Sequence, residues 1–302
     1  MHKLYLKERD DEMLRYLELM EYATVYNLGR LVPRAVNEYF STINTSQKLK
    51  RIKDQLGYVD INKAVRLGFP YVYFLTKKGK EYLDTNFGKV HTSAIWNSSS
   101  WKHDLYVNEV AVDIIRSRNI GDVLMGRYTN SRSFDPEYRK SGGSSIAPDL
   151  FLVLENRLRF FLEVDCRHDE KDFDRKALWY SKYPNQWWYK AYSVFLAEKG
   201  IRLKTKPPKP VLAWVVYSHT EQANIEYTCP KKEISEATRN KELVRTRNAL
   251  RKLTKFRRIY LIPGHWLKDK KGFVSCEDYK REYDKLSASE ALERMPKYDI
   301  LH

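Results

Sequence analysis

The apolar positions of the first ninety residues follow a helical period and then a strand period. From residue 8 to 32 they recur every three or four residues, which predicts a helix followed by a second, short one. The next stretch, "NTSQKLKRIKDQLG", predicts a third helix with Ser46 as its N-cap and Gly57 at its end. Its apolar face consists of Leu49, Ile52 and Leu56. Two strands, "YVDINK" and "PYVYFLT", are predicted next, and Thr76 is expected to cap a further helix.

This order of elements is typical of a winged helix-turn-helix domain, which we predict for residues 1–90. The segment "YFLTKKGKEYL" resembles the wing-to-helix segment of many winged-helix regulators. The predicted third helix presents a basic face, formed by Lys48, Lys50, Arg51 and Lys53. We expect this face to bind double-stranded DNA. The alternative is a small helical domain whose cationic face is simply solvated.

A small, polar stretch at 88–100 predicts a boundary, after which a second domain occupies residues 100–302. Its pattern predicts an amphipathic helix from residue 101, the strand "GDVLMGRYT", and a hairpin of two strongly apolar runs in "APDLFLVLENRLRFFLEVD". A helix at 171–182, the strand "PVLAWVVYS", a basic helix at 239–256 and the strand "RRIYLIP" follow. The whole chain is therefore expected to be an α/β protein.

Three acids, Asp149, Glu163 and Asp165, lie along one edge of this apolar hairpin. Side chains alternate along a strand, so Glu163 and Asp165 point the same way. A turn centred on Asn156 would set Asp149 across from Glu163, and a two-residue turn would shift this pairing by one. Opposed carboxylates repel each other unless a cation lies between them or one holds a proton. Oxygen ligands of this kind suit Mg²⁺ or Mn²⁺. Acids at strand ends in water, or paired with Arg and Lys, are the alternative.

This series of elements, with Pro148-Asp149 and then Glu163 and Asp165, resembles the core of the PD-(D/E)XK nuclease superfamily over residues 101–217. Together with the predicted winged helix, "HDLYVNE" and "DRKALWYSKY", it is similar to the replication-relaxation family, which includes relaxases of the mobilisation C class. The resemblance implies a restriction-endonuclease-like domain with a central mixed sheet. It also implies metal-dependent cleavage of a phosphodiester.

The resemblance also implies roles for individual residues. Asp149 and Glu163 match the two metal-binding acids, whereas Asp165 stands where the superfamily usually has its catalytic lysine. Asp165 is therefore expected to be a third ligand or a substitute for that lysine, and Lys176 to supply the positive charge from the next helix. Two residues of the predicted helix from 101 are further candidates, His103 as an assisting base and Glu109 as a metal ligand. A structural histidine and a solvated lysine are the alternatives.

The charge of the chain changes the picture of its partners. Its 302 residues carry a formal net charge of +16, which favours a polyanionic partner such as nucleic acid. Much of this charge lies in the predicted basic helix, and Arg245, Arg251 and Lys255 are the expected DNA contacts there. The sequence has neither a run long enough to span a membrane nor a signal-like start, so we expect a cytoplasmic protein.

These patterns lead to two hypotheses for function. The first is a relaxase or nicking endonuclease of a plasmid or mobile element that cleaves at an origin. The second is a noncatalytic replication initiator or transcription regulator in which the nuclease-like domain is a scaffold. The expected partner is double-stranded DNA at an origin, and further candidates are single-stranded DNA, a second copy of the chain and mobilisation accessory proteins.

Overall fold

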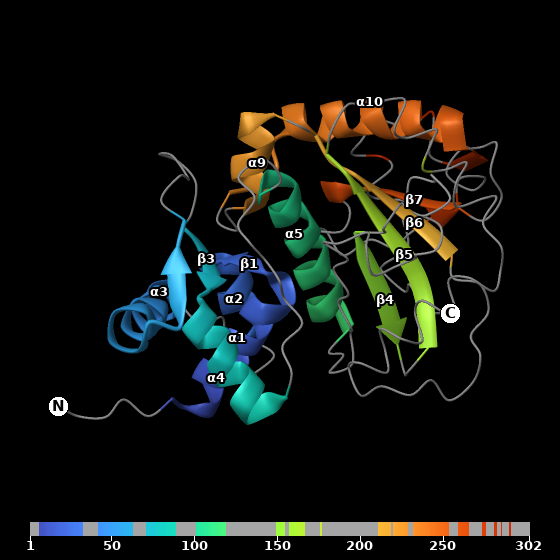
Figure 1. Ribbon diagram of the computed structural model, residues 1–302. Helices are drawn as coiled ribbons and strands as arrows, with labels where there is room; N and C mark the ends of the chain where they lie inside the picture. Colours follow the sequence, from blue (N-terminus) through green and yellow to red (C-terminus); the bar gives the residue numbers. More distant parts are fainter. Residues whose placement is uncertain are drawn as a thin grey trace, which may run out of the picture. The chain divides into compact units, whose positions relative to one another are not determined.

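The computed structural model describes the following parts of the chain: 6–32, 42–62, 71–88, 101–118, 149–154, 157–166, 176, 211–218, 220–228, 232–253, 259–265, 274–275, 281–282, 285 and 290. The fold is α/β and divides into two compact units, each with its own sheet (Figure 1). One unit contains residues 1–118 and 221–233, and the other contains 119–220 and 234–302.

The first unit contains a three-stranded antiparallel sheet in the order β1-β3-β2. Its central strand carries buried Val72 and Tyr73, and α1 buries Leu14 and Leu17 against the same core. The elements are α1 (Glu8–Met20), β1 (Tyr22–Thr24), α2 (Val25–Leu31), α3 (Thr42–Arg51), the π-helical turn η1 (Ile52–Leu56), β2 (Val59–Ile61), β3 (Val72–Leu75), α4 (Lys77–Phe87), α5 (Trp101–Arg118) and α9 (Glu221–Thr228).

Local signals explain most element ends in this unit. Gly57 ends η1 with φ 67°, a left-handed conformation that favours glycine. Thr76 caps α4 by accepting the N–H of Gly79 at 3.1 Å. A Cβ on Gly79 would lie 2.1 Å from the carbonyl oxygen of Tyr58, so only glycine allows this close approach. The predicted N-cap Ser46 is wrong: α3 begins at Thr42, and Ser46 lies inside the helix.

The two units divide the chain differently from the expected limits of 1–90 and 100–302. The first unit also includes α5 and the segment 221–233. The reason is packing, because α5 lies against α2, β1 and α9. The order of elements up to α4 is the predicted one apart from β1, which was not expected. The assignment of this order to a winged helix stays a prediction.

The second unit is built on a mixed five-stranded sheet in the order β4-β5-β6-β7-β8. The β5/β6 and β6/β7 pairs are parallel, and the β4/β5 and β7/β8 pairs are antiparallel. The described side chains of central β6 are all buried, as the run "VLAWVV" indicates. Helix α10 packs against β6 and β7 (Figure 1). The elements are β4 (Leu150–Leu154), β5 (Arg157–Asp165), β6 (Val211–Val216), α10 (Glu236–Leu253), β7 (Ile259–Pro263) and β8 (Val274–Ser275).

The predicted hairpin, the strand at 210–218, the basic helix and the last strand are thus confirmed, with α10 beginning three residues earlier than expected. Helix α9 and strand β8 were not predicted. The strand expected at 121–129 lies outside the described residues. So does the helix expected at 171–182, apart from Lys176, which is helical.

Candidate functional site

Asp149 lies immediately before β4 and faces the strand that carries Glu163. Leu150 pairs with Leu162, and continuing this register by one residue sets Asp149 across from Glu163. Two hydrogen bonds hold Asp149 there. Its N–H donates to the Leu162 carbonyl at 3.0 Å, and its Oδ2 accepts the N–H of Val164 at 2.8 Å. The Asp149 carboxylate is therefore fixed on β5, next to Glu163.

A β-bulge between Leu152 and Val153 produces this register. Nearer the turn, Leu154 pairs with Arg157, as in a hairpin with a two-residue turn. Continued without the bulge, that register would set Asp149 across from an apolar residue. The extra residue of the bulge shifts the pairing by one and restores the arrangement of opposed acids. Bulges occur often beside functional sites, where they redirect a side chain.

Lys176 supplies the cation that the opposed acids require. Glu163 is buried, with a relative exposure of 1 %, and its Oε2 forms an ion pair with the Lys176 Nζ. Burial lowers the pKa of Lys176, but Glu163, Asp149 and Asp165 together raise that pKa by more, so that it lies above its ordinary value. Lys176 is therefore a firmly protonated ammonium whose charge interacts with all three acids.

Asp165 forms a different ion pair. The Nη2 of Arg245, on α10, lies 3.2 Å from the Asp165 Oδ2, and the Nη1 of Arg245 donates to the carbonyl of Tyr217. The N–H of Tyr217 in turn donates to the Asp165 carbonyl at 2.8 Å. The guanidinium thus joins the ends of β5 and β6. Asp149, Glu163 and Asp165 thus each have a cationic or backbone partner within the protein.

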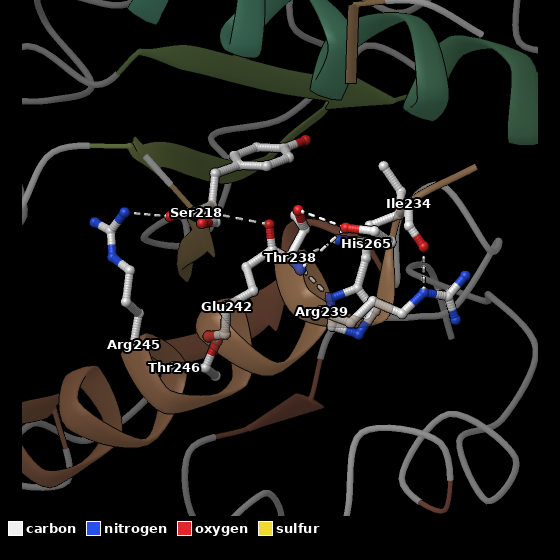
Figure 2. Close-up of polar contacts among 10 residues, drawn as sticks. Ser218, Ile234, Thr238, Arg239, Glu242, Arg245, Thr246 and His265 are labelled. Atoms are coloured by element: carbon white, nitrogen blue, oxygen red, sulfur yellow. Dashed lines mark hydrogen bonds and ion pairs between the residues drawn. The ribbon is translucent and has the colours of Figure 1, made fainter. Parts of the chain in front are cut away.

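Glu242, one turn before Arg245 on α10, holds this helix to the sheet (Figure 2). Its Oε1 accepts the N–H of Ser218 at 3.1 Å, beyond the end of β6. Its Oε2 accepts the N–H of His265 at 2.9 Å and lies 2.5 Å from the Nδ1 of the same residue. Glu242 and His265 are fully buried. This contact fixes the part of α10 from which Arg245 extends.

Sequence analysis missed the roles of Glu242 and His265. One signal was present, because Glu242 is the single acid in the otherwise cationic stretch from 239 to 258. An isolated acid in such a helix suggests a specific buried partner. His265 carried no comparable signal, since the partners of a lone histidine after a strand depend on the tertiary fold.

Two predicted site residues, His103 and Glu109, lie on α5 in the first unit. Glu109 has a relative exposure of 2 % and accepts from the Nδ2 of Asn27 at 2.6 Å and the Nη1 of Arg30 at 2.7 Å. Arg30 also pairs with Asp113. Glu109 therefore helps to tie α2 to α5. Its predicted role as a metal ligand and that of His103 as a catalytic base stay predictions.

The predicted DNA contacts of α3 and η1 divide into two kinds. Lys48 and Arg51 pair with fully buried Asp10 of α1, at 3.1 and 3.3 Å. Lys50 is exposed, and Lys53 is partly exposed. Asp10 therefore orients two of the four cations, whereas Lys50 extends into solvent. Binding of DNA to this face stays a prediction.

The predicted contacts of α10 also differ in their surroundings. Arg251 is exposed, so it is accessible to a phosphate backbone. Arg245 is directed inward to Asp165, and the exposed fraction of its side chain is only 12 %. Lys255 lies outside the described residues. One of the residues assigned to DNA from its charge thus lies beside the acids of the hairpin.

The carboxylates of Asp149 and Glu163 offer the hard oxygen ligands that Mg²⁺ and Mn²⁺ prefer. A site of one or two carboxylates is typical for Mg²⁺, which keeps several waters or takes substrate phosphates. Among the described residues, no three His, Cys, Asp or Glu side chains are arranged to hold a metal ion. The donor set of Asp149 and Glu163 fits such an ion.

No helix in the described part of the chain is both long and apolar enough to cross a membrane. Neither a curated protein nor a solved structure matches the sequence significantly. The sequence pattern of the replication-relaxation family matches residues 14–195, which include β1 to β5, α5 and the acids of the hairpin. That match covers more than half of the chain. The chain therefore belongs to the replication-relaxation family, whose name indicates a role in replication or relaxation.

Proposed function

We propose that this protein is a metal-dependent nicking endonuclease that acts on DNA at an origin of a plasmid or mobile element. The cluster of Asp149, Glu163 and Lys176 carries the proposal. It joins two opposed carboxylates, one of them almost fully buried, to a protonated lysine at one edge of a mixed sheet. Groups of this kind can bind a divalent ion and stabilise the charge of a pentacovalent phosphate.

Each residue has a distinct role in this proposal. Asp149 and Glu163 would hold Mg²⁺ or Mn²⁺, and the bound ion would neutralise charge on the phosphodiester. Lys176 would donate hydrogen bonds to a non-bridging phosphate oxygen, for which its permanently protonated ammonium is suited. The exposed cations Lys50 and Arg251 would hold the DNA backbone and contribute to the salt dependence of binding.

A second function, a noncatalytic origin-binding scaffold, is favoured by one observation. Lys176 already pairs with Glu163, and Arg245 already pairs with Asp165. Internal ion pairs therefore relieve the repulsion between the acids without any metal ion. A protein that only bound an origin could retain this arrangement for stability alone.

Nicking of plasmid DNA distinguishes the two functions. A supercoiled plasmid that carries the DNA flanking the protein's own coding sequence is incubated with protein and Mn²⁺ or Mg²⁺. The wild type is expected to convert the plasmid to the open circle. Glu163→Gln should nick at least about 100-fold more slowly, because removing one group that stabilises transition-state charge typically costs a factor of this size. Lys176→Met should also lose nicking activity, and Lys77→Met, which removes a lysine with 92 % exposure in the first unit, is its matched control.

Binding of the same DNA is measured in parallel by mobility shift. Glu163→Gln should bind as the wild type does. Binding without nicking under either metal ion would favour the scaffold over the endonuclease. Nicking that persisted in Glu163→Gln would show that the chemistry belongs to other residues.

A further inference from the structure

Arg245 has a different partner in the structure from the one its sequence context suggests. It lies in a strongly basic helix, which predicts a contact with DNA. Instead, its guanidinium divides between the Asp165 carboxylate and the Tyr217 carbonyl. Its side chain has only 12 % exposure, and that of Asp165 has 20 %. This contact is internal to the second unit.

The position of Asp165 explains why such a contact matters. Asp165 follows Glu163 by two residues on β5, so the two side chains leave the same face of the strand. The charge of Asp165 also acts on Lys176, the cation paired with Glu163. A carboxylate at this position would be a natural third ligand for an ion held by Asp149 and Glu163.

We propose that Arg245 is a positioning residue that keeps the Asp165 carboxylate out of the ligand set, so that the site offers an ion two carboxylates instead of three. This inference rests on the proposed metal site of Asp149 and Glu163. Arg245 acts only through Asp165, so it is distinct from the residues that would touch the ion or the DNA.

Two features of the second unit support this role. The guanidinium contacts two partners, the Asp165 carboxylate and the Tyr217 carbonyl. One turn earlier, Glu242 fixes α10 through Ser218 and His265 (Figure 2). A planar guanidinium held by two partners has little freedom to release the carboxylate. In addition, no three acidic, histidine or cysteine side chains among the described residues form a metal-binding group, as expected when Asp165 is engaged elsewhere.

The number of carboxylates would set which ions the site prefers. Each added carboxylate raises the affinity for a divalent cation, and ligand-rich sites suit ions with flexible, high coordination. Mg²⁺ instead keeps waters or substrate phosphates in its shell. A site limited to two carboxylates would therefore leave positions for a phosphodiester.

The test is isothermal titration calorimetry with Mn²⁺ alone, in the absence of DNA. Arg245→Gln removes the guanidinium that pairs with Asp165, and Arg245→Gln with Asp165→Asn also removes the Asp165 carboxylate. Lys241→Gln is the matched control, because it also replaces a cation by glutamine, at an exposed position of the same helix. We expect Arg245→Gln to bind Mn²⁺ about ten-fold more tightly than the wild type, since a third carboxylate joins the site. The double variant should return to the wild-type affinity, and Lys241→Gln should not differ from the wild type.

Melting temperatures in EDTA verify that each variant is folded. If Arg245→Gln does not fold, Arg245→Lys serves instead, because it keeps the charge but cannot form both contacts. It should bind Mn²⁺ about three-fold more tightly than the wild type, as part of the third carboxylate becomes accessible. Unchanged or weaker binding in the folded variant would overturn the inference.

The inference and the proposed function fail in different ways. If the wild type binds Mn²⁺ and Arg245→Gln binds it no better, the positioning role is lost and the metal site stands. If the wild type does not bind Mn²⁺, the metal site of the proposed function fails. In that case, the positioning role is still supported if Arg245→Gln gains Mn²⁺ binding and Asp165→Asn abolishes the gain. If Arg245→Gln gains no binding, the positioning role is overturned together with the metal site.

Discussion

Replacing Lys176 by methionine should strongly destabilise the second unit, because it leaves the Glu163 carboxylate charged and buried. Glu163 has 1 % exposure, and the Lys176 side chain has 27 %. Removing one partner of a buried ion pair costs about 3–5 kcal/mol. The partial exposure of Lys176 lets water reach the site, so we expect a cost near the lower value, about 3 kcal/mol. For a unit of this size that corresponds to a fall in melting temperature of about 6–12 °C.

Scanning calorimetry at pH 7 measures this change. Glu163→Gln alone and together with Lys176→Met completes a double-variant cycle. The double variant should regain much of the lost stability, because neither charge remains buried without a partner. If the melting temperature of Lys176→Met fell by less than about 2 °C, with no recovery in the double variant, this ion pair would not stabilise the fold.

The pH dependence follows from the raised pKa of Lys176 in the folded protein. A raised pKa means that the folded state binds the proton more tightly than the unfolded chain does. The stabilising contribution is then complete below the unfolded value, about pH 10, and is lost as pH rises beyond it. The stability difference between wild type and Lys176→Met should therefore be constant as pH rises from 7 to 9. A decline within that interval would contradict the assigned protonation state.

Three further changes test other contacts. Asp10→Asn removes the charge that Lys48 and Arg51 share, and we expect it to lower stability in calorimetry by about 2 kcal/mol, because Asp10 is fully buried. Glu242→Ala leaves buried N–H groups without their acceptor, so urea unfolding should show a loss of about 3 kcal/mol or more. Arg251→Gln should reduce the dependence of log K for random duplex DNA on log salt by about one unit. An unchanged salt slope would exclude Arg251 from the DNA contacts.

The elements of the fold that sequence analysis predicted are those with strong local signals. Thr76 and Gly57 mark helix ends through side-chain capping and a left-handed φ, and both were predicted correctly. The apolar run of β6 also predicted a strand, and the structure shows that its described side chains are all buried. By contrast, β1 and β8 have only three and two residues, and such short strands form because a partner strand is present.

The candidate site was predictable only in part. Alternation along β5 placed Glu163 and Asp165 on one face, but the register of Asp149 depended on a bulge that no sequence signal announced. Charge alone assigned Arg245 to DNA, although its partner Asp165 is eighty residues earlier in the chain. Contacts across such separations are set by the tertiary fold, so a local pattern identifies the charge but not what it neutralises.

The charges of the site bear on how DNA and a metal ion would depend on each other. Among the described residues, three carboxylates, Asp149, Glu163 and Asp165, interact with two cations, Lys176 and Arg245, which gives a formal excess of one negative charge. The whole chain carries +16. Its overall field therefore attracts DNA, whereas the immediate site repels a phosphodiester. A bound divalent ion would reverse the sign of the site. Binding of DNA to the protein should then need no metal ion, while approach of a phosphodiester to Asp149 and Glu163 should require one.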